Sequence, residues 1–214
     1  MNIYKLVLES IEQYPRSEPI FIDEIKEYVI KQYKDTEREK VSKNINVILN
    51  RLKKECLVKS DCKGVYYRPG ISIFGEVGCN QIRLMQLKYL KDRNGNIKGY
   101  ITGAKLFNRI GLTTQVPNVI DIVTNECKYH KQYDEKLRTY ITKPKIMITN
   151  ENYKYLQFID ILENRDNINI EVKNANEILY KIIQECNLDF EKIIKYARET
   201  KSKVAINKIV ALAR

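Results

Sequence analysis

Apolar and polar residues alternate along the N-terminal part of the chain with the period of α-helices. An apolar stripe over residues 3–14 ends at a proline, and a second stripe follows over residues 23–33. A third runs from residue 36 to about residue 56, and its first four residues, Thr-Glu-Arg-Glu, match a capping box. The pattern therefore predicts three helices. The inward face of the third would carry Val41, Ile45, Ile48, Leu49 and Leu52.

After the third helix the period changes to two. Short alternating runs at residues 57–60 and 65–68 flank a turn that ends in Gly64, which is typical of a β-hairpin. Pro69-Gly70 is expected to stop the second strand. Three helices followed directly by a hairpin is the order of a winged helix-turn-helix, a DNA-binding fold. We therefore predict such a domain over residues 1–70.

The polar side of the third helix is a candidate DNA-reading face. A step of about 100° per residue places its polar side chains opposite the apolar stripe. An ordinary solvated face mixes Lys with Glu, but here acids are absent between Glu39 and Glu55. Lysines can hold phosphates, and asparagine can pair with adenine in the major groove. The predicted face consists of Lys40, Lys43, Asn46, Val47, Asn50 and Lys54.

The hairpin adds three cations to this candidate interface. Lys59, Lys63 and Arg68 lie on or near a wing that would follow the adjacent DNA backbone or minor groove. Alternation predicts that one of Tyr66 and Tyr67 packs on the helices while the other faces out. Winged helices can also mediate protein contacts, which is the alternative to DNA binding.

The remaining residues, 71–214, predict a second domain. Residues 70–98 carry few strong signals beyond a helical stretch at 82–90 and a turn at 92–96. Helical patterns follow at 104–110, 153–163, 175–186, 190–200 and 204–213, and strand patterns at 119–123 and 137–148. The predicted class is α+β, with an N-terminal winged helix-turn-helix and a mixed, mostly helical C-terminal domain.

The amino-acid composition indicates which kinds of molecule the protein is expected to bind. Lys and Arg number 38 against 27 Asp and Glu, and a net charge of +11 favours a polyanion such as nucleic acid. The five cysteines are scattered, and Cys127 and His130, the closest approach to a metal half-site, lack a second pair of ligands. We expect reduced thiols, no metal and no cofactor. Because apolar runs stay short of the roughly 18 residues that cross a bilayer, a cytoplasmic protein is expected.

One pattern suggests an enzyme. Asp160 followed by Glu171 and Lys173 resembles the carboxylates and lysine of Mg²⁺-dependent nucleases. However, Asp160 falls inside an amphipathic helix, and phosphate-loop, GxSxG and HExxH motifs are absent from the sequence. We expect a protein without enzymatic activity, and keep a Mg²⁺-dependent nuclease as an alternative.

Several segments together resemble a known family. The hairpin end KGVYYRP, the segment GYITGAKLFNRIGLTTQVP at Gly99–Pro117, and the following VIDIVTN are similar to the AbiEi-type antitoxins of type IV toxin-antitoxin systems. The final KIIKYARETKSKVAINKIVALAR is similar to that family's last helices, so the resemblance covers most of the chain. The sequence departs from the family at Arg109-Ile110, where Leu or Asn-Leu is frequent.

The resemblance implies a bacterial or phage-encoded protein that represses its own operon. The C-terminal domain would counter a nucleotidyltransferase-like toxin without a stable complex, and two copies would bind double-stranded operator DNA as an inverted repeat. The residue patterns by themselves support only DNA binding, and the antitoxin role depends on the resemblance. A plain winged-helix regulator with a ligand-sensing C-terminal domain therefore stays open. We expect Gly111–Pro117 to be structural, although Thr113, Thr114 and Gln115 could contact a ligand or partner if they are exposed.

Overall fold

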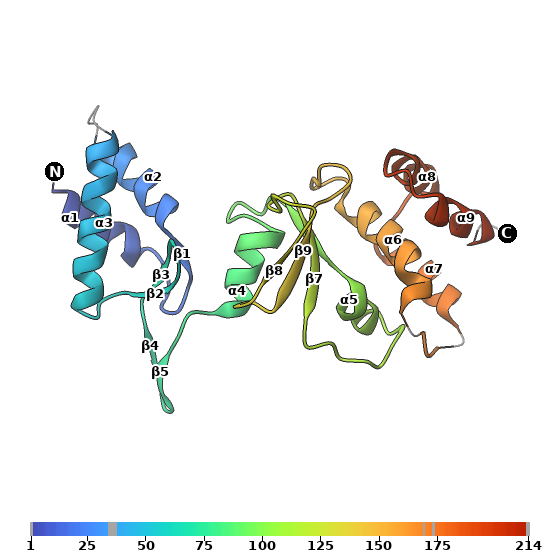
Figure 1. The fold of residues 1–214 in the computed structure, drawn as a ribbon, viewed down its shortest axis with the longest axis horizontal. Coiled ribbons are helices and arrows are strands. Elements are labelled where there is room, and N and C mark those ends of the chain that lie inside the picture. Colours follow the sequence, from blue (N-terminus) through green and yellow to red (C-terminus); the bar gives the residue numbers. More distant parts are fainter. Residues whose placement is uncertain (1, 34–37, 169, 173, 213–214) are drawn as a thin grey trace. The chain divides into compact units, whose positions relative to one another are not determined.

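The computed structural model describes residues 2–33, 38–168, 170–172 and 174–212. Within these ranges the chain is a mixed α+β protein, as expected, and it divides into two compact units, Met1–Leu84 and Met85–Arg214 (Figure 1). The predicted domain boundary after Gly70 lies inside the first unit. None of the helices in the described ranges has the length and apolarity needed to cross a membrane.

Three helices form the core of the first unit. They are α1 (Ile3–Glu12), α2 (Ile22–Tyr33) and α3 (Arg38–Lys54). Their apolar stripes meet in one cluster, in which Leu6, Ile25 and Ile45 are fully buried. The periodicity thus predicted these helices correctly. Thr36 and Glu37, which would begin the capping box, lie outside the described residues.

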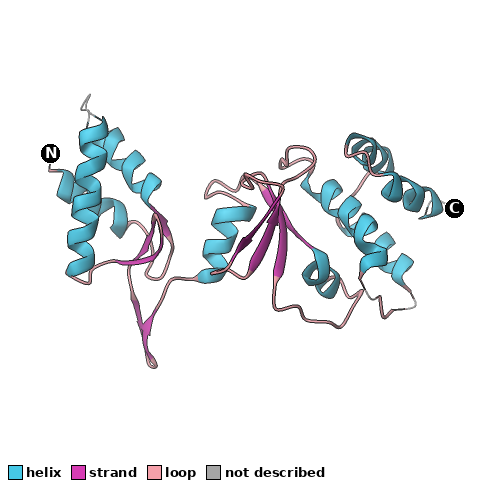
Figure 2. Ribbon diagram, viewed as in Figure 1, coloured by secondary structure: helices cyan, strands magenta, loops and turns pink. Residues whose placement is uncertain are grey.

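A small antiparallel sheet follows the helices (Figure 2). It pairs β1 (Ile20–Phe21), β3 (Val65–Tyr67) and β2 (Lys59–Cys62) in that order. The predicted strand at 57–60 begins later than expected, because its first residues complete α3. Cys56 adopts a left-handed φ of 58°. The amides of Leu57 and Val58 both donate to the carbonyl of Leu52, at 3.0 and 3.4 Å, which caps the helix instead of pairing in the sheet.

A second hairpin, which the sequence pattern did not predict, comes next. It consists of β4 (Gly70–Ser72) and β5 (Gly75–Val77). The first hairpin ends before Pro69, as predicted, but a new strand begins at Gly70. The chain then returns to the first unit. The Asn80 amide donates to the Ser17 carbonyl at 2.8 Å, and Arg83 Nε lies 3.0 Å from Glu18 Oε1. These contacts explain why the unit extends to Leu84 rather than ending at the first hairpin.

The second unit contains a four-stranded mixed sheet, ordered β6-β7-β9-β8. Its strands are β6 (Gly99–Thr102), β7 (Ile120–Thr124), β8 (Lys131–Asp134) and β9 (Thr139–Thr142). Only β7 and β9 are parallel to each other. The predicted strand at 119–123 is confirmed as β7, and the pattern at 137–148 contains β9. The sequence pattern did not predict β6 and β8.

Helices pack on this sheet and on one another (Figure 2). After α4 (Gln81–Met85), most of which belongs to the first unit, the helical segments are the π-helical turn η1 (Gln86–Leu90), α5 (Gly103–Arg109), α6 (Tyr153–Asn164), the 3-10 turn η2 (Arg165–Asn167), α7 (Ala175–Glu185), α8 (Phe190–Glu199) and α9 (Lys203–Leu212). Met85 and Tyr89 pack on one face of the sheet, and Leu156 of α6 packs on the other. The predicted helices of this unit are therefore present, with small shifts at their ends.

Gly99 is a position where the backbones of the second unit approach too closely for a side chain. A Cβ there would lie 2.2 Å from the Tyr89 carbonyl oxygen and 2.7 Å from that of Val123. We expect Gly99→Ala to lower the free energy of unfolding by at least about 2 kcal/mol, because rigid backbone must move. Gly78→Ala is the control, since a Cβ there meets nothing within 4 Å. Urea unfolding followed by circular dichroism measures both, and equal stability of the two variants would contradict the expectation.

Candidate nucleic-acid interface

The predicted reading face of α3 is exposed along its whole length. The opposite stripe is buried, and Leu49 and Leu52 have no exposed surface. Ile48 is half-buried against the same core. The apolar Val47 is 65% exposed in the middle of the polar face. The exposed side chains are Lys40, Lys43, Asn46, Val47, Asn50 and Lys54.

Three further exposed side chains, Asn44, Arg51 and Lys53, border the predicted face and were not included in it. Asn44 and Arg51 lie on the side of α3 nearest to α1, where the Arg51 guanidinium is 5.5 Å from the centre of the Tyr4 ring. Arg51 Nε also donates to Glu55 Oε1 at 2.9 Å. Each lies about 100° or less around the helix from a predicted contact, so helical geometry alone would have found them.

The three hairpin cations have different surroundings. Lys59 Nζ is held by both carboxylate oxygens of Glu76, at 2.6 and 2.8 Å, and this hydrogen bond raises the pKa of the lysine. Arg68 turns toward the end of α1 and donates to the carbonyls of Glu12 and Tyr14. Lys63 is exposed at the turn of the hairpin. Lys59 and Arg68 therefore already have protein partners.

Both hairpin tyrosines contact the protein. Tyr67 is buried at 9% exposure, and Tyr66 is half-buried against the core of the first unit. Tyr66 packs on the helices, as predicted for one of the two tyrosines. The prediction that the other faces outward is wrong, because Tyr67 is buried as well.

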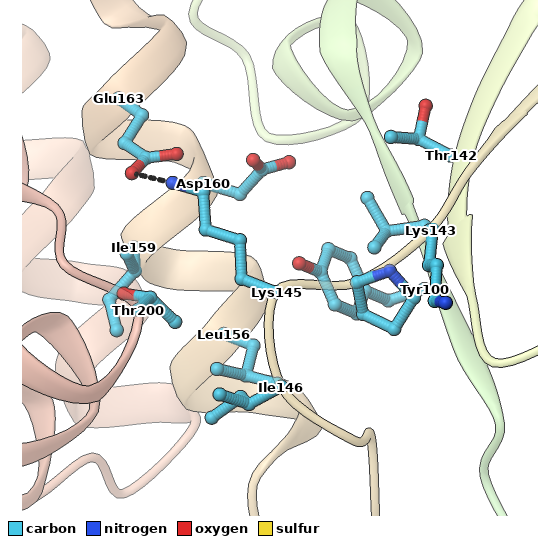
Figure 3. A pocket seen from close by; sticks show the side chains of 12 residues that line it. Tyr100, Thr142, Lys143, Lys145, Ile146, Leu156, Ile159, Asp160, Glu163 and Thr200 are labelled. Atoms are coloured by element: carbon cyan, nitrogen blue, oxygen red, sulfur yellow. Dashed lines mark hydrogen bonds and ion pairs between the residues drawn. The ribbon is translucent and has the colours of Figure 1, made fainter. Parts of the chain in front are cut away.

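Asp160, the candidate nuclease residue, lines a small pocket in the second unit (Figure 3). The pocket holds about 100 Å³ between α6 and the sheet. Asp160 accepts hydrogen bonds from Thr102 Oγ1 and from the Asn164 side chain. The nearby Lys145 is engaged by Glu163 at 2.6 Å. Burial raises the pKa of Asp160 to about 6.

The other residues of the nuclease pattern have separate surroundings. Glu171 lies outside the strands and accepts from the Thr114 amide at 2.9 Å and from the Thr114 hydroxyl. These bonds lower the pKa of Glu171. Lys173 lies outside the described residues. The structure therefore gives Asp160 and Glu171 different protein partners and does not place them in a common acidic cluster.

In the described part of the chain, no group of three or more His, Cys, Asp and Glu side chains is placed to hold a metal ion. Cys127 is buried, and its Sγ donates to the Tyr129 carbonyl at 2.9 Å. The neighbouring His130 is exposed.

The Gly111–Pro117 segment connects α5 to β7. Gly111 has a φ of 78°, the left-handed conformation expected at a helix end, and Leu112 is fully buried. Thr113 is also buried, at 4% exposure, and its carbonyl accepts from the Asn108 side chain. The Thr114 amide and hydroxyl both donate to the Glu171 carboxylate. Of the three polar residues considered as ligand contacts, only Thr114 and Gln115 are exposed.

The first unit thus consists of packed helices and β-hairpins, and one of its helices exposes a polar face. The second unit is a larger α+β unit. Residues 7–187 match a family of unknown function, DUF6088, and the chain belongs to this family. No curated protein matches the chain. The family carries no assigned activity, so a function has to be argued from the residues.

The raised pKa of Asp160 predicts a pH dependence of stability. Because the folded protein holds this proton more tightly than the unfolded chain, the stabilisation is present at low pH and is lost as pH rises from about 4 to about 6. Between pH 4.5 and 7.5 the native chain should lose on the order of 2 kcal/mol more than Asp160→Asn. Urea unfolding of both proteins at the two pH values measures this difference. An identical pH dependence would mean that Asp160 is not buried as described.

Proposed function

We propose that this protein is a DNA-binding transcriptional repressor whose first unit is a winged helix-turn-helix. The observation that carries the proposal is the outer face of α3, where six candidate contacts are exposed on one side and acids are absent between Glu39 and Glu55. Beyond Glu39 in the first turn of α3, this face carries no acid down to Lys54, which suits the major groove because acidic side chains would repel the flanking phosphates.

The arrangement of the first unit supports this assignment. Three packed helices precede the β2–β3 hairpin, and β1 from the loop before α2 completes its sheet. This is the element order of winged helices, which place the third helix in the major groove and the hairpin beside it. In the proposed complex α3 is the recognition helix.

Side-chain chemistry suggests how α3 reads DNA. Asn46 and Asn50 can each accept from and donate to adenine, and a bidentate contact of this kind discriminates by about 1–3 kcal/mol. Val47 would contact a thymine methyl group. Lys43 and Lys54 would hold phosphates on either side of the groove.

The wing contact is assigned to Lys63 alone. Its two companions are already engaged, Lys59 by Glu76 and Arg68 by the end of α1. Lys59 and Arg68 would therefore hold the two hairpins and α1 in place, while Lys63 reaches the DNA backbone. A single unit of this size reads a short site, so we propose that two copies bind an inverted repeat.

Replacing Lys43 and Asn50 together by Ala tests the recognition face. Operator affinity should fall about tenfold to a hundredfold, because a phosphate contact and a base contact are both lost. Both residues are exposed, so the helical circular dichroism signal and the melting temperature should stay nearly unchanged. Mobility shift with the promoter of the protein's own gene measures the affinity.

Lys5→Ala is the control for charge, since Lys5 is exposed on α1 and pairs with Glu9. It removes one positive charge from the same unit and should leave specific binding within about twofold. If the double variant bound the operator as tightly as the native chain, α3 would not be the reading element.

The cellular role that we propose is that of an autorepressor and antitoxin of a type IV toxin-antitoxin system. The support is the resemblance of residues 99–117 to AbiEi-type antitoxins. We expect a nucleotidyltransferase-like gene immediately downstream, whose expression arrests growth unless this protein is co-expressed. Pull-down of the two proteins should recover no stable complex.

The alternative is a plain regulator that senses a ligand in the second unit, for which the pocket beside Asp160 is the candidate site. A downstream gene of another kind, or growth arrest that this protein does not relieve, would favour that alternative over the antitoxin role. Either outcome leaves the proposal of DNA binding by α3 in place, since that proposal rests on the first unit.

A further inference from the structure

The β8–β9 hairpin of the second unit presents aromatic rings and cations on one face. Tyr133 and Tyr140 are direct partners in the antiparallel register, and their ring centres are 4.7 Å apart. Lys131 Nζ lies 4.4 Å from the centre of the Tyr140 ring. The two tyrosines are 45% and 39% exposed. Both rings therefore offer surface that a flat group can reach.

This face is open because the helices cover other parts of the sheet. Side chains alternate along β9, so Ile141 is buried on one face while Tyr140 points to the other. On the face of Tyr140, α6 packs over β6 and β7, where Leu156 contacts Tyr100 and Val123. The exposure of Tyr133 and Tyr140 shows that this cover does not extend fully over β8 and β9.

The segment that carries the two tyrosines is positively charged, although Asp121 of β7 lies next to Tyr140 in the sheet. Residues 128–145 contain six Lys and Arg residues and two acids, Asp134 and Glu135. Asp134 forms an ion pair with Lys88 Nζ at 2.6 Å and accepts a hydrogen bond from the Tyr89 hydroxyl at 2.7 Å. The cations of this segment are Lys128, Lys131, Lys136, Arg138, Lys143 and Lys145.

We propose that the β8–β9 face binds single-stranded nucleic acid. Neighbouring bases would stack on Tyr133 and Tyr140, and Lys131 and Arg138 would hold the phosphates between them. Stacking on aromatic rings inside a basic groove is how single strands are bound without base-pairing edges. A duplex does not fit this chemistry, because its bases are already stacked on one another. The site is separate from α3 and does not rest on the proposal for the first unit.

Fluorescence anisotropy of the full chain tests the proposal with labelled oligouridine RNA, oligothymidine DNA and an unrelated DNA duplex. The two single strands show whether the site distinguishes ribose from deoxyribose. The Tyr133→Leu/Tyr140→Leu variant should bind single strands at least about tenfold more weakly, because both stacking surfaces are lost. The Tyr133→Phe/Tyr140→Phe variant keeps the rings and should bind within about twofold of the native chain.

Two further variants separate this site from α3 and from effects on folding. Lys43→Ala/Asn50→Ala should retain single-strand binding. Lys131 is exposed, so Lys131→Ala should fold normally. It should lower the slope of the logarithm of the binding constant against the logarithm of the salt concentration by about one. This measurement tests the proposal even if the Leu variant fails to fold.

Four results would overturn the proposal: native affinity in a folded Leu variant, equal losses in the Leu and Phe variants, loss of single-strand binding in Lys43→Ala/Asn50→Ala, or an unchanged salt slope in Lys131→Ala. Failure of the native chain to bind single strands at low salt would also reject it.

Discussion

The burial of one face of α3 against α1 and α2 is the constraint on which the candidate interface depends. Ile45, Leu49 and Leu52 are all at 0% exposure, and turning the helix by one residue would bring such side chains to the surface. Exposing one such side chain would lower the free energy of unfolding by about 1.5–3 kcal/mol, which is a large part of the stability of a small unit. The core therefore determines which side of α3 faces outward, and hence which residues are available to a partner.

The same reasoning applies to the cations of the first unit. Positive charge alone does not make a contact, since an ion pair or a helix end can engage the side chain first. Glu76 of the unpredicted β4–β5 hairpin holds Lys59, and the last carbonyls of α1 accept from Arg68. The proposed interface is consequently concentrated on α3 and the β2–β3 turn, and we propose a structural role for the second hairpin.

The sequence predicted what local periodicity determines. The helices of both units and the outer face of α3 follow from apolar spacing, because a helix of ten or more residues repeats its pattern several times. The strands β4, β6 and β8 contain three or four residues each, which gives a period of two little chance to stand out. The strands β2 and β3 are no longer, but they flank a turn that ends in Gly64, and this turn made the hairpin predictable. The early end of α3 depends on the left-handed Cys56, which no spacing indicates.

Contacts between residues far apart in the chain could not be predicted from the sequence, for a different reason. The pairs Lys59 with Glu76 and Thr114 with Glu171 form only after the chain has folded, and charge patterns do not specify them. The contact between the Tyr133 and Tyr140 rings likewise exists only through the register of β8 on β9. The residues that could serve in a site were predictable from their side-chain chemistry. Which partner each side chain contacts could be seen only in the structure.

The central claim is that α3 enters the major groove of DNA. Interference by base analogues in the promoter of the protein's own gene tests it most directly, since 7-deazaadenine lacks the major-groove N7 acceptor of adenine and uracil lacks the major-groove methyl group of thymine. We predict that these substitutions weaken binding within two short, symmetrically placed sites. Binding that tolerates both substitutions throughout the promoter, or the absence of duplex binding, would contradict the assignment of α3 to the major groove.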